Sequence, residues 1–286
     1  MTTILVTGAT GNIGVHLVRQ LAAGSERVRA FVRDADKARA LLGDQVDLAV
    51  GDFADPSSIA AAVDGVDRVF LLTPSHPEMV TYERAILDSA LAAGVQRVVK
   101  MSTVGADPRS DGRFTSWQGE CEELRRASAI PSVILRSSYH MTNLFFFAES
   151  IRSAGKIFAP VDEAKIAMVD RRDLAAVAAL ALTEDGHDGR TYLISGPEAI
   201  TYHDVTSQLS QVLGKTVEFV DVPDEAATAA ALRAGAPEWM ALGIGEVHRQ
   251  LKRGIAAQTS DVVRVLLERE PYGLADFARD TAAVFS

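Results

Sequence analysis

Four side chains in the middle of the sequence can stabilise or protonate an oxygen atom that gains negative charge. Ser102 offers a hydroxyl group and Gln118 an amide, and both can donate a hydrogen bond to a carbonyl oxygen. Tyr139 and His140 follow in the segment RSSYHMTN, and histidine titrates near neutral pH, which makes it a candidate proton donor. We expect these four residues to be catalytic. The alternatives are a capping role for Ser102 and a packing or hydrogen-bonding role for His140.

Gln118 and Glu122 lie four residues apart and therefore share one face of a predicted helix. An amide cannot usefully exchange a proton, so Gln118 would only hold an oxygen atom. Glu122 could act as an acid only if burial raised its pKa. A hydrogen-bonded pair within the helix is the competing interpretation.

The segment VTGATGNIG near the N-terminus has the spacing G-x-x-G-x-x-G. It follows an apolar strand and opens a helix, so a pyrophosphate could approach the bare backbone and meet the free N–H groups of the helix N-terminus. Ordinary turns also use glycine, but the strand–turn–helix context favours a dinucleotide site. The residues expected to contact the cofactor here are Gly8, Thr10, Gly11, Asn12, Ile13 and Gly14.

The end of the second predicted strand bears on which dinucleotide binds. Folds specific for NAD usually place a carboxylate there for the ribose hydroxyls, but this chain reads AFVRDADK, with Arg33 at the tip and Lys37 one helical turn later. A guanidinium can hold a 2′-phosphate through two parallel hydrogen bonds. We therefore expect NADP(H) to be preferred over NAD(H). Asp34 could still serve the ribose, or it could cap the next helix.

Two further loops and one strand end are expected at the same edge of the sheet. Asp52 and Phe53 follow the third strand and suit the amino group and ring of an adenine. Leu72, Thr73 and Pro74 follow the fourth strand, where a cofactor would cross the sheet. Ser102, at the end of the fifth strand, is expected to contact the cofactor as well.

Short apolar runs alternate with amphipathic segments through the first half of the chain. The predicted strands cover residues 3–8, 27–33, 46–52, 67–73, 96–102 and 132–137, and helices are predicted to begin near Asn12, Asp34, Asp55, Pro77 and Trp117. This alternation predicts parallel strands joined by right-handed crossovers, which is an α/β fold with a Rossmann-type doubly wound parallel sheet.

The regular alternation of strands and helices ends after residue 142. Residues 143–155, 170–183 and 201–214 read as helices, residues 157–161, 190–196 and 216–222 read as strands, and several more helices follow. We expect residues 1–142 to form the NADP-binding core. Residues 143–286 would add to the sheet and form a smaller, mostly helical portion that binds the substrate.

The composition excludes several functions. The chain of 286 residues has a net charge of −9, which argues against a general nucleic-acid binder. The single cysteine, Cys121, permits no internal disulfide, and the histidines lack metal-ligand spacing, so no metal site is predicted. No signal peptide and no membrane-spanning segment is recognised, and a cytoplasmic protein without a membrane partner is expected.

Several segments together resemble the NmrA-like, atypical short-chain dehydrogenase/reductase family, which includes quinone oxidoreductase-like members. The likeness covers nearly the whole chain and runs through VTGATGNIG, Arg33, GDFADPSSI, GVDRVFLLTP, AGVQRVVKMS, ILRSSYHMTNL, VDRRDLAAVAALALTEDGHDGRTYLISGPEAITY and LGKTVEFVDVP. The resemblance implies a Rossmann-type fold and a nicotinamide cofactor.

The chain departs from the pattern of this family at three places. Many members have a His-x-x-x-Glu pair where this chain has Gln118 and Glu122, and Arg-Pro where it has Arg136 and Ser137. An aromatic residue usually stands where His140 does. The Tyr-x-x-x-Lys pair of many nicotinamide-dependent reductases is also missing from the helix after Ser102.

Two hypotheses follow. The first is an NADPH-dependent reductase of a carbonyl group, in a quinone or an aromatic ketone, whose small, apolar and aromatic substrate is reduced without the Tyr–Lys pair. The second is a non-catalytic sensor of the NADP(H) redox state. The oligomeric state is left open between monomer and homodimer.

Overall fold

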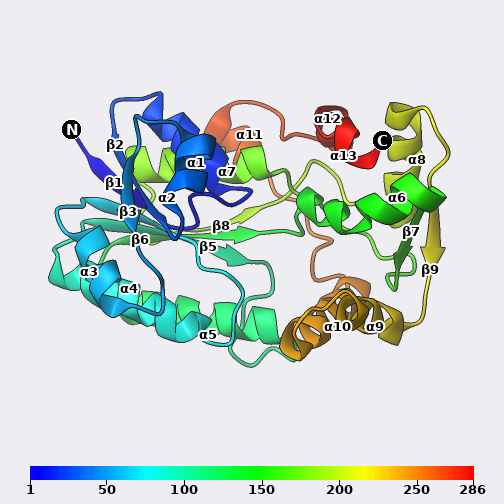
Figure 1. Cartoon of the computed structure of the whole chain (residues 1–286), viewed down its shortest axis with the longest axis horizontal. Coiled ribbons are helices and arrows are strands. Elements are labelled where there is room, and N and C mark those ends of the chain that lie inside the picture. The colour runs from blue at the N-terminus through cyan, green and yellow to red at the C-terminus, as the bar shows by residue number, and fades with distance from the viewer.

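The computed structural model describes all residues 1–286 and is built around a seven-stranded parallel sheet with the order β3-β2-β1-β4-β5-β6-β8 (Figure 1). The strands are β1 Thr3–Val6, β2 Arg27–Val32, β3 Asp47–Val50, β4 Arg68–Leu71, β5 Arg97–Thr103, β6 Ser132–Ser137 and β8 Thr191–Ile194. The order reverses between β1 and β4, and open α/β sheets bind ligands in the crevice at such a point. The predicted doubly wound fold is confirmed.

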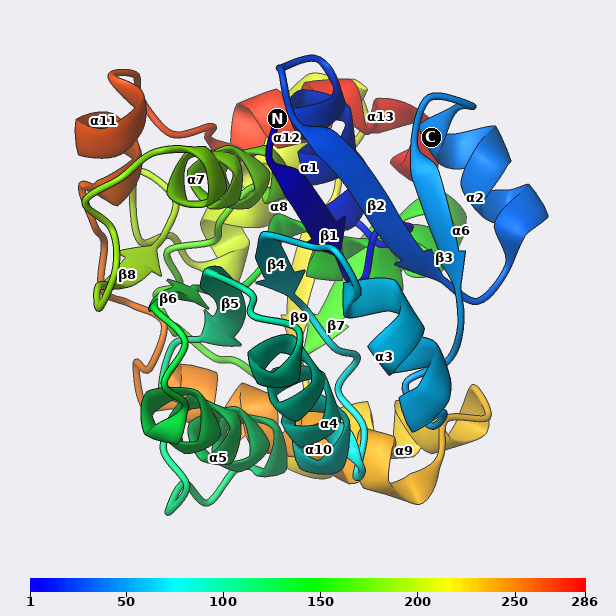
Figure 2. The same cartoon turned by 90° about the vertical axis from the view of Figure 1, so that its left-hand side faces the viewer.

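Helices cover both faces of the sheet (Figure 2). One face carries α1 Gly14–Ala22, α2 Ala35–Leu42 and α7 Arg171–Thr183, and the other carries α3 Pro56–Val63, α4 Met79–Ala92 and α5 Arg113–Ala127. Because parallel strands covered on both sides have no solvated face, the central strands are mostly apolar. None of the helices combines the length and hydrophobicity that crossing a membrane requires.

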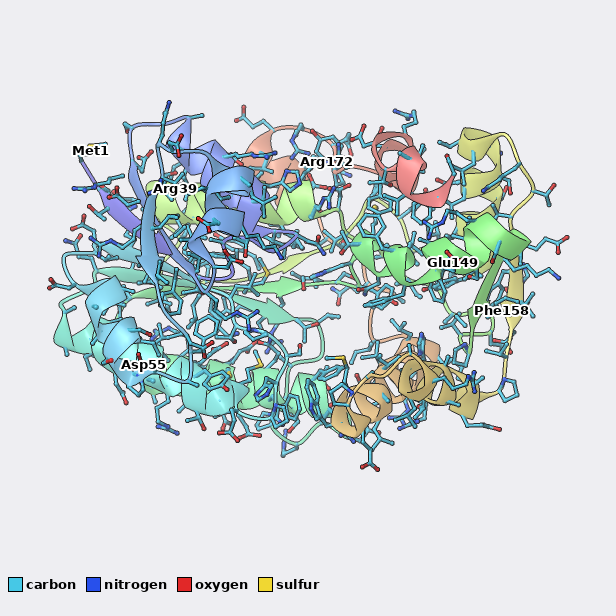
Figure 3. All side chains as sticks on the ribbon, in the orientation of Figure 1. Met1, Arg39, Asp55, Glu149, Phe158 and Arg172 are labelled. Carbon is cyan, nitrogen blue, oxygen red and sulfur yellow. The ribbon has the colours of Figure 1, made fainter.

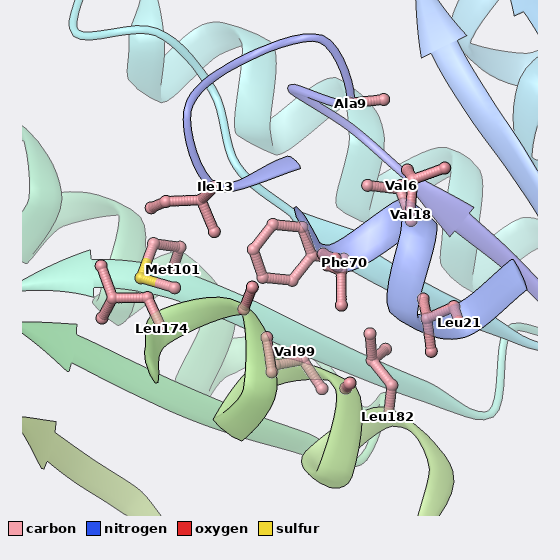
Figure 4. Packing of buried hydrophobic residues seen from close by; sticks show 14 of the residues in the cluster. Val6, Ala9, Ile13, Val18, Leu21, Phe70, Val99, Met101, Leu174 and Leu182 are labelled. Carbon is pink, nitrogen blue, oxygen red and sulfur yellow. The ribbon is translucent and has the colours of Figure 1, made fainter. Parts of the chain in front are cut away.

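The largest core cluster lies between the central strands and the helices α1 and α7 (Figure 4). Phe70 of β4 and Val99 of β5 are completely buried there, and Leu17 of α1 and Leu174 of α7 pack from the helix side. Burying a side chain of this size stabilises the fold by about 1.5–3 kcal/mol. The core thus fixes the strand ends at which the predicted site residues stand.

Aspartates cap three of the predicted helices. The carboxylates of Asp34, Asp55 and Asp170 accept the backbone N–H of the residue two or three positions later. The helix predicted near Trp117 begins earlier, at Arg113, because Gly112 is extended and the Arg113 N–H donates to the Glu246 carboxylate over 2.9 Å.

The second half of the chain adds β8 to the main sheet and builds a smaller unit beside it. The elements of the smaller unit are the 3-10 helix η1 Met141–Phe147, α6 Ala148–Ala154, β7 Lys156–Ala159, α8 Tyr202–Leu213, β9 Glu218–Asp221, α9 Asp224–Arg233, α10 Glu238–Lys252, α12 Leu274–Asp280 and α13 Ala282–Phe285. The helix α11 Val262–Leu267 packs instead against α7 and β8 of the main sheet. Strands β7 and β9 pair in parallel as a separate two-stranded sheet, which the sequence did not predict. Glu149 and Phe158 mark this end of the molecule, opposite Met1 (Figure 3).

Candidate active site

The glycine turn has the geometry that a pyrophosphate needs. Gly8 has a φ of +63°, and its carbonyl accepts the N–H of Gly11 over 3.0 Å. A Cβ on Gly14 would lie 2.1 Å from the Gly8 oxygen, so only glycine fits there. The N–H groups of Asn12, Ile13 and Gly14 donate to no backbone carbonyl, and no side chain caps α1. These residues therefore fit a bound dinucleotide, since free N–H groups at a helix N-terminus attract phosphate.

Arg33 lies directly after β2 and is exposed, as is Lys37 on α2. Neither side chain makes a hydrogen bond or an ion pair within the protein. The neighbouring Asp34 accepts the Lys37 N–H over 3.0 Å and thereby caps α2. Two cations are thus available at this strand end, whereas the carboxylate beside them is engaged by the helix.

The loop after β3 presents an aromatic ring. Phe53 is half-buried and packs against Phe31, with ring centroids 5.3 Å apart, and it stacks on Tyr82 at 6.0 Å. The exposed Asp52 accepts the N–H of Ala54 over 2.9 Å and so shapes the loop. Both residues stand at the predicted adenine end of the crevice.

The loop after β4 is tied to the glycine turn. The Leu72 N–H donates to the Thr7 hydroxyl over 2.8 Å, and a Cβ on Gly8 would lie 3.1 Å from the Leu72 oxygen. Thr73 is buried, whereas Pro74 is exposed. The backbone of this loop therefore forms one wall beside the turn.

Ser102 is only 2% exposed, and its hydroxyl donates to the Glu122 carboxylate over 2.6 Å. Glu122 also accepts two bonds from Arg136, at 2.8 and 2.7 Å, and one from Arg126 at 2.6 Å. These contacts join β5, α5 and β6. The Ser102 hydroxyl is thus occupied within the protein, so its catalytic and cofactor-binding roles stay predictions.

Glu122 is held as an anion. Burial raises the pKa of this carboxyl group, but the bonds from Arg136 and Ser102 outweigh burial and leave the pKa below its usual value. An acid role required a raised pKa, so the geometry favours the structural interpretation of Glu122. It pairs across elements rather than with Gln118.

His140 is half-buried at the end of β6, and its Nε2 lies 3.0 Å from the Ser137 hydroxyl oxygen. Because that hydroxyl donates to the Ser102 carbonyl over 3.1 Å, it accepts from His140, which places the proton on Nε2. Burial lowers the pKa of His140 to about 4. The ring is therefore neutral at physiological pH, and the titration near neutrality that suggested a proton donor is absent.

Tyr139 is half-buried and packs against the core cluster of the smaller unit. Burial raises the pKa of its hydroxyl, while hydrogen bonding to Tyr202 and Asn143 acts in the opposite direction. The phenol is therefore protonated at neutral pH and can donate a hydrogen bond. Its role in catalysis stays a prediction.

Gln118 is half-buried on α5, and its Oε1 accepts a hydrogen bond from Lys100 Nζ over 2.7 Å. Lys100 and its ion-pair partner Glu83 were not expected at the site. The signal was available, since a lysine in the middle of the apolar strand RVVKMS requires a buried partner of opposite charge.

Aromatic side chains gather where α10 meets α5. The rings of Trp239, Trp117 and Phe114 lie within 5.7–6.4 Å of one another, and His76 contacts the edge of Trp239 at 5.6 Å. Arg113 fixes α10 to α5 through two bonds to Glu246, at 2.9 and 2.8 Å. Flat apolar surface is thus available next to the strand ends.

Comparison with known proteins places the chain in a family. The model of the NmrA-like family matches residues 1–257. The chain is 36% identical over 282 residues to the NAD(P)H azoreductase of Xenophilus azovorans, covering 99% of both chains. It is also 36% identical over 287 residues to the (4-alkanoyl-5-oxo-2,5-dihydrofuran-3-yl)methyl phosphate reductase of Streptomyces griseus, again covering 99% of both.

Solved structures agree with this placement. The NADPH-dependent quinone oxidoreductase of Escherichia coli, complexed with NADPH, superposes with a TM-score of 0.88 at 25% identity, covering 99% of this chain and 100% of that one. The triphenylmethane reductase of Citrobacter sp., complexed with NADP(H), gives a TM-score of 0.85 at 27% identity, covering 98% and 99%.

These findings confirm the family that the sequence resembles. The predicted enzyme class, an NAD(P)H-dependent oxidoreductase, is also confirmed, since these relatives are such enzymes. The roles of individual residues, the boundary at residue 142 and the preference for NADP(H) stay predictions.

Proposed function

The chain belongs to the NmrA-like family, and on this basis we propose that it is an NADPH-dependent reductase of a small, flat, conjugated molecule with a carbonyl group, such as a quinone or an aromatic ketone. The observation that carries the proposal is the glycine turn. Its N–H groups at Asn12, Ile13 and Gly14 have no backbone acceptor, and the turn follows β1, where the strand order reverses. A phosphate-binding turn at this point is typical of dinucleotide sites.

Arg33 and Lys37 support NADP(H) over NAD(H). Both cations are exposed and have no partner in the protein, so a 2′-phosphate would meet no competing anion for them. Asp34 caps α2 and is therefore engaged away from a ribose. A guanidinium is well suited to a phosphate because it offers two parallel donors.

When bound, NADPH would supply a hydride to the substrate, which then takes up one proton. The protein must orient the substrate and stabilise the charge that gathers on its oxygen atom. In a quinone that charge is delocalised over the ring, so hydrogen-bond donors such as Gln118 and Tyr139 suffice in place of a tyrosine activated by lysine. The names of the relatives, an azoreductase, a quinone oxidoreductase and a triphenylmethane reductase, also point to conjugated molecules.

The test is the oxidation of NADPH by the purified protein with a panel of quinones, aromatic ketones and azo compounds. We expect turnover that depends on both the protein and the acceptor, with quinones or aromatic ketones the best substrates. NADPH alone is the control for slow reaction with oxygen. Tight NADPH binding without turnover of any acceptor would instead favour the non-catalytic sensor.

A further inference from the structure

The ammonium group of Lys100 has all three of its hydrogen-bond donors occupied. Its Nζ atom donates to Glu83 Oε1 over 2.8 Å, to Gln118 Oε1 over 2.7 Å and to the Met101 carbonyl over 2.7 Å. The side chains of Lys100 and Glu83 are both 0% exposed. One buried cation on β5 therefore connects the helices α4 and α5.

The same carboxylate holds the loop after β4. The Thr73 hydroxyl donates to Glu83 Oε1 over 2.7 Å. Leu72, one residue earlier, is bonded to Thr7 at the base of the glycine turn, with its N–H 2.8 Å from the Thr7 hydroxyl oxygen. A continuous set of contacts thus runs from the glycine turn through Glu83 and Lys100 to Gln118.

The contact with Lys100 decides which way the Gln118 amide points. Because Lys100 can only donate, the atom facing it must be the amide oxygen. The Nε2 group of Gln118 then lies on the other side of the amide, and it donates to no atom of the protein. A free pair of N–H donors is thus left on a half-buried side chain.

Stability does not account for the ion pair. Replacing a buried ion pair by apolar side chains of similar size is often neutral or stabilising, whereas a single orphaned charge is strongly destabilising. The ion pair instead fixes the orientation of the Gln118 amide. A methionine at position 100 would fill the space but would leave the Gln118 amide free to rotate by half a turn.

Building on the proposed function, we propose that Lys100, held by Glu83, is a positioning residue that fixes the Gln118 amide with its N–H groups toward the substrate oxygen. Hydride transfer to the substrate breaks the carbonyl double bond and leaves the electron pair on that oxygen, which a proton then neutralises. Gln118 donates a hydrogen bond to this oxygen as its charge grows. Lys100 contacts neither substrate nor cofactor.

The test is a cycle of variants that keeps the buried charges balanced. Lys100→Met/Glu83→Gln removes both charges, Gln118→Leu removes the amide, and a third protein combines all three changes. We expect each of the first two to lower kcat by about 100-fold, as the loss of one oxyanion donor does. The KM for NADPH should change by less than about threefold, because the glycine turn is untouched.

The decisive comparison is the combined variant. If Lys100 acts through Gln118, the combined protein should be no slower than Gln118→Leu alone. Losses that multiply in the combined variant, or a wild-type kcat in Lys100→Met/Glu83→Gln, would overturn the proposal.

An NMR measurement, which needs no turnover, tests the role of Lys100 independently of the proposed reductase activity. In protein labelled with ¹⁵N-glutamine, the side-chain amide signals of Gln118 are identified by their loss in Gln118→Leu. They should move or broaden in Lys100→Met/Glu83→Gln, and unchanged signals would refute the positioning role. An inactive wild type would refute the proposed reductase, while the amide signals would still report on Lys100.

Discussion

At the scale of single residues, the ionisable groups near the strand ends do not readily release protons at neutral pH. His140 is neutral, Tyr139 has a raised pKa, and Glu122 is a bound carboxylate. Cys121 is buried beside Glu83, and burial together with that carboxylate raises the pKa of its thiol. Such a site suits a substrate whose product anion is already stabilised by conjugation.

A first prediction concerns the pH dependence of His140. Its pKa in the folded protein, about 4, lies below the ordinary value of 6.5, so the unfolded chain binds more protons between these values. The stabilising contribution is therefore complete above 6.5 and is lost as the pH falls toward 4. Between about pH 7 and about pH 5, the wild type should lose more free energy of unfolding than His140→Asn does, with a difference on the order of 1 kcal/mol. Thermal unfolding at the two pH values measures this difference.

The kinetic counterpart is a pH profile of kcat. Because His140 stays neutral, the wild type and His140→Asn should have the same pH profile near pH 6.5. An inflection near that pH that is present in the wild type and absent in the variant would restore His140 as the proton donor. His248, whose pKa burial also lowers to about 4, serves as the control for a histidine away from the strand ends.

At the scale of elements, the site depends on turns that only certain residues can form. The β1–α1 turn needs glycine at position 14, where a Cβ would lie 2.1 Å from the Gly8 oxygen and 2.7 Å from the Ala9 Cα. A Cβ on Gly11 would approach the same oxygen only to 3.2 Å. Alanine at position 14 should therefore destabilise the turn more than alanine at position 11 does.

Gly14→Ala should destabilise the fold by about 1–3 kcal/mol, because the added methyl group meets backbone that must move. It should also weaken NADPH binding by at least about tenfold, since the N–H groups of the turn are displaced. Thermal unfolding and a cofactor titration measure the two effects.

Gly11→Ala is the matched control and should unfold at a temperature close to that of the wild type. Equal stability of the two alanine variants would contradict the geometry of the turn. Such a result would also mean that steric crowding does not explain the glycine at position 14.

Much of the element order was predictable because each strand and helix carries its own local signal. The caps at Asp34, Asp55 and Asp170 follow from the preference of helix N-termini for short acceptor side chains. The pairing of β7 with β9 was not predictable, since about sixty residues separate strands that have no distinguishing pattern. The early start of α5 depends on Glu246, which lies far along the chain.

The predicted site residues stand at the same edge of the sheet, but their partners could not be read from the sequence. Ser102 and Gln118 were expected to face a substrate, yet Ser102 is bonded to Glu122, and Gln118 is bonded to Lys100 through its oxygen. Which polar groups satisfy each other inside a protein depends on packing between elements. Sequence spacing records only neighbours within one element.

At the scale of the whole molecule, the main sheet and the smaller second unit each have a hydrophobic core of their own. The second unit holds α10, which Arg113 and Glu246 fix to α5. The glycine turn, Arg33 and Lys37 belong to the sheet unit, whereas the aromatic cluster joins Phe114 and Trp117 of α5 to Trp239 of α10.

We propose that the glycine turn and Arg33 hold NADP(H), and calorimetry of cofactor binding is the direct measurement of this role. The wild type should bind NADPH at least about tenfold more tightly than NADH, and Arg33→Ala should remove most of that difference by weakening NADPH alone. Arg233→Ala, which removes an exposed arginine of α9 without bonded partners, should leave both affinities unchanged. No measurable binding of either dinucleotide to the wild type, or equal losses for both cofactors in Arg33→Ala, would be incompatible with an NADP(H) site at these residues.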